Sequence, residues 1–386
     1  MERRRVGILG ATGAVGQRFI QILSNHPWFE IAWIAASDRS AGKRYDEACR
    51  WKLDTPLPPR IAAMTLMPNL PEGTPHGDLP RIIFAALDAD IARDLEPKFA
   101  AAGCAVISNS SAFRMTRDVP LVVPEVNADH LALIEQQSWR RQRCADGKPG
   151  GYIVTNPNCC AIGLVLALAP LQQRFGIERL FVSTLQAVSG AGYPGVASLD
   201  ILGNVVPFIK NEEEKLQEEI GKLLGRLVLG DESGGHIEML DAPLSAHCNR
   251  VAVVDGHMEC VSVKLRTPAT RDQMLAAWAE FQPLHSIHEG HPLPSAPEQP
   301  VEYDDGIDRP QPRLDLMRGN GMATTIGRLR PCNLFDWKFV LLSHNTIRGA
   351  AGAAVLNAEI LAMLGKLEWK DAPGSAPRPA MKAAMA

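Results

Sequence analysis

The sequence predicts an α/β protein in which a doubly wound parallel sheet is followed by a second, α+β domain with a mixed sheet. Three observations lead to this fold class. Short apolar strands alternate with helical stretches over residues 1–157, a glycine-rich turn joins the first strand to the first helix, and the later strands are longer and of mixed burial. Alternating strands and helices form βαβ units with a parallel sheet, whereas long half-buried strands suit a mixed sheet.

The first domain is predicted over residues 1–157. Its first strand and helix lie in RVGILGATGAVGQRFIQIL, where a short apolar run enters the glycine turn and leaves it as an apolar-periodic helix. Further strands are expected in four segments: FEIAWIAASD (29–38), RIIFAAL (81–87), CAVISNS (104–110) and YIVTNPN (152–158).

The second domain is predicted over residues 158–344. Its strands are expected in RLFVSTLQAVSG (179–190), HCNRVAVVDGHMECVSVKLR (247–266) and FDWKFVLLSHN (335–345). A charged helix is expected at 211–225, with most of its charges solvated, and a long loop or arm at 282–315. A helix rich in small residues at 345–366 is expected to complete the first domain, and the tail at 371–386 to be flexible.

Composition limits the classes of function. The chain has 386 residues with a net charge of −3, and its charges of both signs are interspersed, which argues against a nucleic-acid surface. The longest apolar run, 159–171, is too short to span a bilayer. Eight cysteines without CxxC pairs indicate free thiols, a reducing cytoplasmic compartment and no metal site.

The glycine-rich turn predicts a Rossmann-type dinucleotide site. A glycine turn between strand and helix lets backbone N–H groups approach a pyrophosphate, and the helix N-terminus favours its charge. The alternative is a tight turn that uses glycine for packing only. The predicted cofactor contacts in this turn are Gly10, Thr12, Gly13, Ala14, Val15 and Gly16.

The end of the second strand bears on the choice of cofactor. Ser37, Arg39 and Ser40 suit a 2′-phosphate, which favours NADP, whereas Asp38 keeps NAD open because an acid at this place holds ribose hydroxyls. A solvated polar loop would explain the same residues without a ligand.

Two adjacent cysteines, in TNPNCC, stand at the start of an apolar helix. A helix N-terminus or a nearby imidazolium lowers the pKa of a thiol, so Cys159 is a candidate nucleophile. The alternative is an inert buried thiol, which is the more usual role of a free cysteine. A nucleophile needs a base, and His257 follows Asp255-Gly256 at a predicted turn.

Nine motifs make the chain resemble the aspartate-β-semialdehyde dehydrogenase family, most closely its archaeal and fungal branch. The resemblance covers residues 4–365, with the motifs in the family's order. They are GATGAVGQ, ASDRSAGK, SNSSAFRM, PEVN, NPNC, QAVSGAGYPG, NEEEK, CNRVAVVDGH and HNTIRGAAG.

The resemblance implies catalytic roles. Cys159 is implied to be the nucleophile that forms a thioester, and Cys160 a bystander. Gln186 is implied to orient the substrate, His257 to act as acid/base, and Asn345 to lie near the nicotinamide amide. Backbone N–H groups at the helix start, with Asn158 nearby, are expected to stabilise the oxyanion.

The resemblance also implies substrate contacts. Arg250 matches the binder of the substrate carboxylate, and Arg114 and Lys215 match the phosphate site. Guanidinium and ammonium groups suit these anions. Glu212 is implied to face the substrate amino group, although two adjacent acids, Glu213 and Glu214, are also candidates.

The implied activity is the NADPH-dependent reduction of L-aspartyl 4-phosphate to L-aspartate 4-semialdehyde, with release of phosphate, by a homodimer or homotetramer. Two alternatives remain open at this point. One is a malonyl-CoA reductase of the same build, which needs no site for a substrate amine. The other is a non-catalytic, nucleotide-binding paralogue.

Overall fold

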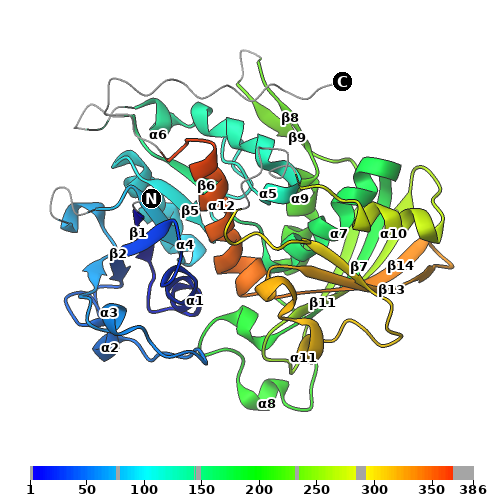
Figure 1. Cartoon of the computed structure of the whole chain (residues 1–386), viewed down its shortest axis with the longest axis horizontal. Coiled ribbons are helices and arrows are strands. Elements are labelled where there is room, and N and C mark those ends of the chain that lie inside the picture. The colour runs from blue at the N-terminus through cyan, green and yellow to red at the C-terminus, as the bar shows by residue number, and fades with distance from the viewer. Residues whose placement is uncertain are drawn as a thin grey trace.

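The computed structural model describes residues 3–74, 79–142, 144, 149–230, 234–283 and 293–367. The predicted tail over 371–386 lies outside the described residues. Two six-stranded sheets and one small hairpin organise the described part of the chain (Figure 1). The predicted fold class, a parallel Rossmann-type sheet followed by a mixed sheet, is confirmed.

The first sheet is parallel throughout and has the order β3-β2-β1-β4-β5-β6. Its strands are β1 (Arg4–Leu9), β2 (Phe29–Ala36), β3 (Met67–Pro68), β4 (Ile82–Ala85), β5 (Ala105–Ser108) and β6 (Tyr152–Thr155). The order reverses direction between β1 and β4, and ligands of such sheets bind outside the carboxyl ends of the strands at this switch point. The glycine turn that follows β1 therefore lies where a dinucleotide would bind.

The helices connected to this sheet are mostly short. They are α1 (Ala14–Leu23), α2 (Tyr45–Ala48), α3 (Pro59–Ala62), α4 (Ala89–Ala101), α5 (Pro124–Asn127), α6 (Ser138–Arg141) and the 3-10 helices η1 (Pro71–Gly73) and η2 (Ala128–Gln136).

The second sheet is mixed and has the order β10-β7-β11-β14-β13-β12. Its strands are β7 (Ile177–Gln186), β10 (Leu244–Arg250), β11 (His257–Leu265), β12 (Val301–Asp304), β13 (Thr324–Pro331) and β14 (Trp337–Ser343). Strand β11 is antiparallel to both of its neighbours, whereas β7 pairs in parallel with β10. A separate hairpin joins β8 (Arg226–Val228) to β9 (His236–Glu238).

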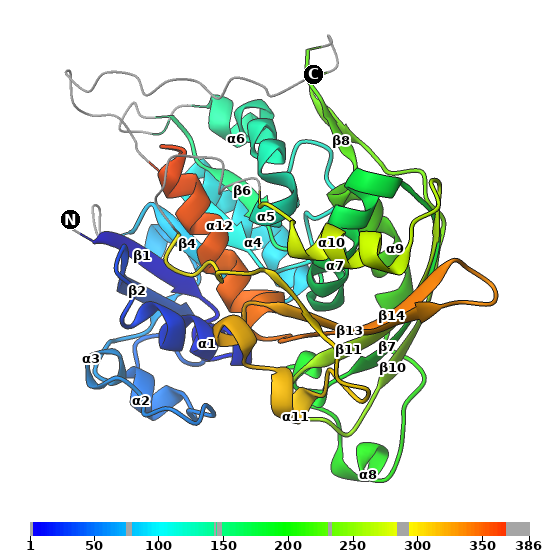
Figure 2. The ribbon, with the colours of Figure 1, turned by 45° about the vertical axis from the view of Figure 1, so that its right-hand side comes forward.

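Three helices pack on one face of the mixed sheet: α7 (Cys159–Phe175), α9 (Glu212–Leu223) and α10 (Arg271–Ala279), as Figure 2 shows. Helix α7 is apolar on all sides and almost wholly buried, as expected of a helix in the middle of a core. The smaller elements of this region are η3 (Val188–Ala191), α8 (Ser198–Ile201), α11 (Pro312–Asp315) and η5 (Arg318–Gly321).

The chain returns to the first sheet after β14. A π-helical turn, η6 (Ile347–Ala351), leads into α12 (Gly352–Met363), whose apolar residues join the same core as β1 and α1. A buried bidentate ion pair fixes the turn, because Arg348 donates to both carboxylate oxygens of Glu125 at 2.6 and 2.7 Å. The start of α12 thus lies between the two sheets (Figure 1).

Two expectations about the second domain need correction. The segment 247–266 is not one strand, because the backbone turns at Asp255-Gly256 and divides it into β10 and β11. The segment 282–315 is not wholly a loop or arm: within its described part, β12 pairs with β13 at the edge of the sheet, and α11 follows. The edge position explains the weak signal, since an edge strand need not alternate strictly.

Candidate active site

Cys159 is the first residue of α7, and Asn158 caps this helix. The Asn158 side-chain oxygen accepts hydrogen bonds from the N–H groups of Cys160 at 2.8 Å and Ala161 at 3.4 Å. An N-cap of this type satisfies two otherwise unpaired donors and fixes where the helix begins. The thiol of Cys159 is thereby placed at the positive end of the helix dipole.

The two adjacent thiols have opposite properties. Interaction with the Cys160 thiol, followed by the charges of His257 and Arg114, holds the pKa of Cys159 well below its usual range, although burial opposes this. Burial, with Cys159 and Glu259 nearby, raises the pKa of Cys160 well above its usual range. Cys160 has no exposed surface, whereas Cys159 is partly accessible. A reactive thiolate is therefore favoured at Cys159 alone.

His257 lies beside both thiols at the start of β11. One ring nitrogen of His257 and the two sulfur atoms all lie within 4.8 Å of one another. Nδ1 accepts the backbone N–H of Ala187 at 3.1 Å, whereas Nε2 is buried without a hydrogen-bond partner in the described part of the chain. The neutral ring therefore carries its proton on Nε2, which is free to interact with a thiolate or with substrate.

Arg250 and Gln186 lie at the ends of the neighbouring strands β10 and β7, in direct register. The Arg250 guanidinium donates to the carbonyl of Ala187 at 2.8 Å. A Cβ on Gly190 would lie 2.9 Å from Arg250 Nη1 and 3.1 Å from His257 Nε2, so the backbone of Gly190 contacts both side chains. The structure thus brings the predicted carboxylate binder and the predicted acid/base together.

Glu212 joins this group from the first turn of α9. Its Oε1 accepts hydrogen bonds from Asn158 Nδ2 at 2.8 Å and from Gln186 Nε2 at 3.1 Å. The adjacent Glu213 instead accepts the backbone N–H of Cys248, and Glu214 is exposed. Of the three adjacent acids, Glu212 is the one that contacts Asn158, the residue before Cys159.

Arg114 approaches Cys159 from the loop after β5. Its Nη1 donates to Glu219 at 2.9 Å and its Nη2 to the carbonyl of Asn109 at 2.8 Å. Its Nε is buried and has no partner in the described part of the chain. Lys215 lies one turn along α9 from Glu212 and is partly exposed. Among the described residues, no hydrogen bond or ion pair engages its ammonium group.

Asn345 is already engaged by protein groups. Its side-chain oxygen accepts the N–H of Gly256 at 2.8 Å, and its nitrogen donates to Ser189 Oγ at 2.8 Å. These two bonds tie the turn before β11 to η3, the segment that covers Arg250 and His257. The amide therefore supports the site here, whether or not it also approaches a nicotinamide.

The glycine turn after β1 fits a dinucleotide. Gly10 has a φ of +71°, and a Cβ there would lie 2.3 Å from the carbonyl oxygen of Ala86. A Cβ on Gly16 would lie 2.2 Å from the carbonyl oxygen of Gly10, so both positions require glycine. Gly13 caps α1 with no side chain, which leaves the first N–H groups of the helix open to an anion. Thr12, Ala14 and Val15 lie in the same accessible turn.

The turn after β2 lies beside the glycine turn. Strands β1 and β2 are neighbours, and the N–H of Ala11 donates to the carbonyl of Ala35 at 2.9 Å. Ser37, Asp38 and Arg39 are exposed just beyond β2, and Ser40 is partly exposed. Their side chains are thus accessible on the side where a ribose attached to the bound pyrophosphate would lie.

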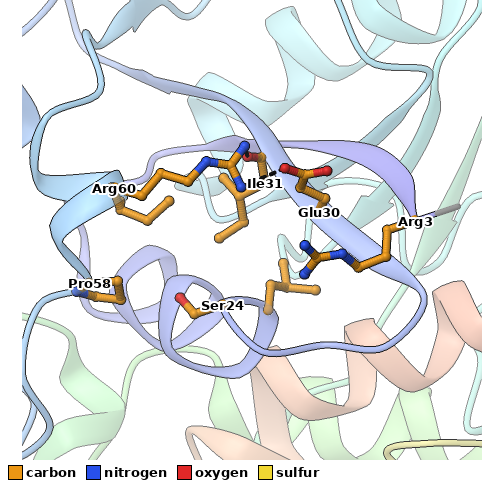
Figure 3. Close-up of a pocket in the computed structure, with 8 residues that line it drawn as sticks. Arg3, Ser24, Glu30, Ile31, Pro58 and Arg60 are labelled. Carbon is orange, nitrogen blue, oxygen red and sulfur yellow. Dashed lines mark hydrogen bonds and ion pairs between the residues drawn. The ribbon is translucent and has the colours of Figure 1, made fainter.

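A small pocket lies at the amino ends of the strands of this sheet, opposite the glycine turn (Figure 3). It is lined by residues near the starts of β1 and β2, including Arg3 and Glu30, and Arg60 pairs with Glu30 at 2.6 Å. Its cavity volume of about 50 Å³ is far below the roughly 300 Å³ at which small-molecule pockets begin. The pocket is also at the amino ends of the strands, so it is not a candidate dinucleotide site.

The expectation for the oxyanion needs correction. The N–H groups of Cys160 and Ala161 are taken by the Asn158 cap, and the N–H of Asn158 donates to Glu219 Oε2 at 2.5 Å. Within the described part of the chain, the Cys159 N–H is the helix-start donor that has no hydrogen-bond acceptor. Of the backbone donors at the helix start, the Cys159 N–H is therefore the one available to an oxyanion.

Four residues of the site carried no signal of their own in the sequence. Glu219 and Lys222 belong to a helix whose charges were expected to be mostly solvated, yet they are 2% and 4% exposed. Glu259 is fully buried two residues after His257 on β11, and Gly349 contacts Cys159. The seven-residue spacing from Glu212 to Glu219 is the one clue, because it places both acids on one helix face.

Comparison with known proteins agrees with this geometry. Residues 5–134 match the family model "Semialdehyde dehydrogenase, NAD binding domain", and residues 168–348 match "Semialdehyde dehydrogenase, dimerisation domain". Fold and family models thus define a semialdehyde dehydrogenase.

Curated relatives narrow the assignment. The aspartate-semialdehyde dehydrogenase of Archaeoglobus fulgidus is 48% identical over 93% of this chain and 98% of its own length. That of Schizosaccharomyces pombe is 46% identical over 95% of this chain and 99% of its own. The chain belongs to the aspartate-semialdehyde dehydrogenase family.

Solved structures give the same result. The NADP-bound aspartate semialdehyde dehydrogenase of Candida albicans superposes with a TM-score of 0.82 at 42% identity, covering 93% of this chain and 98% of the other. The Vibrio cholerae aspartate semialdehyde dehydrogenase II complexed with ASA gives 0.70 at 26% identity, covering 94% and 99%.

Proposed function

We propose that this chain reduces L-aspartyl 4-phosphate to L-aspartate 4-semialdehyde and phosphate, with NADP as its cofactor. The observation that carries the proposal is the convergence of five side chains from five elements at the start of α7. Those side chains are Cys159, Gln186, Glu212, Arg250 and His257. Family membership and the dinucleotide turn support the same reading.

The substrate's charged groups each have a partner in this arrangement. We propose that Arg250 binds the α-carboxylate and that Glu212 faces the α-ammonium. Arg114 and Lys215 would bind the phosphoryl group. The orphaned Nε of Arg114 supports this assignment, because a buried donor without a partner costs about 1–3 kcal/mol and a phosphate oxygen would satisfy it.

The covalent step begins from the Cys159 thiolate. It attacks the acyl carbon, the bond to the phosphoryl oxygen breaks, and a thioester remains. We propose that the Cys159 N–H stabilises the oxyanion. Departing phosphate requires one proton, and we propose that His257 supplies it as an imidazolium that has taken this proton from the Cys159 thiol. The turns after β1 and β2 would hold NADPH. Bound NADPH would supply the hydride that converts the thioester to the aldehyde.

Assembly and location are part of the proposal. Residues 168–348 match a dimerisation domain, and we propose a homodimer or homotetramer built through this region. We also propose two domains. The first comprises residues 1–157 together with 345–366, and the second comprises residues 158–344. Eight free cysteines suit a reducing cytoplasm. Within the described ranges, none of the helices combines the length and apolar character that a membrane crossing requires.

The test is a phosphate-dependent assay. Aspartate semialdehyde, phosphate and NADP are mixed with the protein, NAD replaces NADP in parallel, and NADPH formation is followed by absorbance. We expect reduction of NADP that requires both semialdehyde and phosphate and that is lost in Cys159→Ala. If NADPH is consumed with malonyl-CoA and the first assay shows no formation of NADPH, the substrate is malonyl-CoA and not L-aspartyl 4-phosphate. If neither assay shows turnover and the protein still binds NADP, the chain is a non-catalytic paralogue.

A further inference from the structure

One face of α9 reaches several parts of the active site. Glu212, Glu219 and Lys222 lie seven and three residues apart, which places them on the same side of the helix. Their exposed fractions are 7%, 2% and 4%. Burying a charged group is costly unless it has a partner. Three buried charged residues on one helix face are therefore expected to have specific partners.

Glu219 bridges two elements of the site. Its Oε1 accepts Arg114 Nη1 at 2.9 Å, and its Oε2 accepts the backbone N–H of Asn158 at 2.5 Å. Asn158 is the cap of α7, and Cys159 follows it. One carboxylate therefore connects the proposed phosphate-binding cation to the residue before the nucleophile.

Lys222 holds the loop that carries Arg114. Its ammonium donates to the carbonyls of Arg114 at 2.7 Å, Thr116 at 2.9 Å and Val119 at 2.8 Å. An ammonium has three protons, so all three are used on this one loop. Lys222 fixes the backbone of Arg114, while Glu219 fixes one edge of its guanidinium.

We propose that Glu219 and Lys222 are positioning residues that set Arg114 for the phosphoryl group, and that Glu219 links this cation to the start of α7. The proposal rests on the proposed function. With Nη1 held by Glu219 and Nη2 held by Asn109, the Nε edge of Arg114 is the edge left for the substrate. Preorganised donors of this kind bind a developing charge without the cost of reorientation.

Steady-state kinetics with phosphate as the varied substrate test the proposal. In Glu219→Gln, one of the two bonds is lost, because the amide nitrogen must face either Arg114 or the Asn158 N–H, which are both donors. Loss of a charge-assisted bond predicts an increase of about ten- to hundredfold in the KM for phosphate. The KM for aspartate semialdehyde is expected to change by less than about threefold, because Arg250 and Glu212 bind that part of the substrate. Glu218→Gln, an exposed neighbour on the same helix, is the matched control.

A double-mutant cycle separates positioning from general stability. If Glu219 acts through Arg114, then Glu219→Gln adds no further increase in the KM for phosphate once Arg114→Met is present. Additive effects of the two substitutions, or equal increases in both KM values, would overturn the proposal. Lys222→Met provides a second, independent variant if Glu219→Gln does not fold, with the same phosphate-selective increase expected.

Failure of this inference differs from failure of the proposed function. If the unmodified protein shows no phosphate-dependent turnover, the proposed function is wrong. If it turns over normally and Glu219→Gln and Lys222→Met bind phosphate as tightly as it does, only the positioning role is wrong.

Discussion

Gly349 lies directly against Cys159. A Cβ on Gly349 would come within 2.7 Å of the Cβ of Cys159 and within 3.0 Å of its Cα. Gly349 belongs to the π-helical turn that the buried Arg348–Glu125 ion pair holds in place. Short π-helical segments are frequent at functional sites, and here one packs directly against Cys159.

This contact predicts that Gly349→Ala displaces the nucleophile. A misplacement of about 1 Å can lower the rate about 100-fold, so we expect a loss of that order in kcat with phosphate and semialdehyde. Cofactor binding is expected to be unchanged, as measured by fluorescence titration with NADPH. Gly221→Ala is the control, because its added methyl group meets mainly the flexible side chain of Met239. Full activity of Gly349→Ala would show that the contact does not position Cys159.

The two adjacent thiols are predicted to react differently. The pKa of Cys159 is lowered and that of Cys160 is raised, so ionisation is favoured at Cys159 over Cys160. We expect iodoacetamide to modify Cys159 rapidly and to inactivate the protein, with Cys160 left unmodified in peptide mass spectra. Cys160→Ser is expected to retain activity, whereas alkylation of Cys160 ahead of Cys159 would contradict the assignment.

Cofactor preference is predicted to depend on the turn after β2. Arg39 is exposed there beside the dinucleotide turn, where a guanidinium can pair with a 2′-phosphate. We expect Arg39→Ala to raise the KM for NADP about tenfold and to leave the KM for NAD nearly unchanged. An equal effect on both cofactors would mean that Arg39 does not contact the 2′-phosphate.

Glu259 predicts a pH-dependent stability. Its carboxyl group has no exposed surface, and neither oxygen has a hydrogen-bond partner in the described part of the chain. Burial first, and then the charges of Cys159 and Glu212, raise the pKa of Glu259 well above its usual range. Between the ordinary and the raised pKa, the folded state binds more protons than the unfolded state. The stability contributed by this group is therefore present at low pH and lost as pH rises.

Glu259→Gln removes this titration. We expect its melting temperature to exceed that of the unmodified protein by about 2 °C or more near pH 8.5, and by a smaller margin near pH 5.5, which is closer to the ordinary pKa of a glutamate. Differential scanning fluorimetry at the two pH values measures both. A gain that is the same at both pH values would show that ionisation of Glu259 is not its source.

Much of the first domain could be predicted from local sequence. Each strand of the parallel sheet except β3 lies in an apolar run that the sequence shows directly, because both faces of such a sheet are buried. The second sheet was less predictable. Strand β13 contains Arg328 at a φ of +57°, and its apolar pattern is interrupted there, so it gave no clear signal.

The candidate site was also predictable from the sequence only in part. Cys159, Gln186, Arg250 and His257 could be proposed because each stands in a recognisable motif. The structure brings them together, while their catalytic roles stay predictions. The choice among the three adjacent acids of α9 was open in the sequence, because one helix register decides which acid meets Asn158 and Gln186.

The sequence by itself determined the alternation of strands and helices, the dinucleotide turn and the thiol at the start of α7. These features are local, since periodicity, glycine and a helix cap act over a few residues. Tertiary packing alone shows that Glu219 and Lys222 face inward and that Gly349 lies against Cys159. It also showed that Asn158 and Glu219 use the helix-start N–H groups. Each of these depends on which distant segment packs against a residue, and no spacing within one segment contains that information.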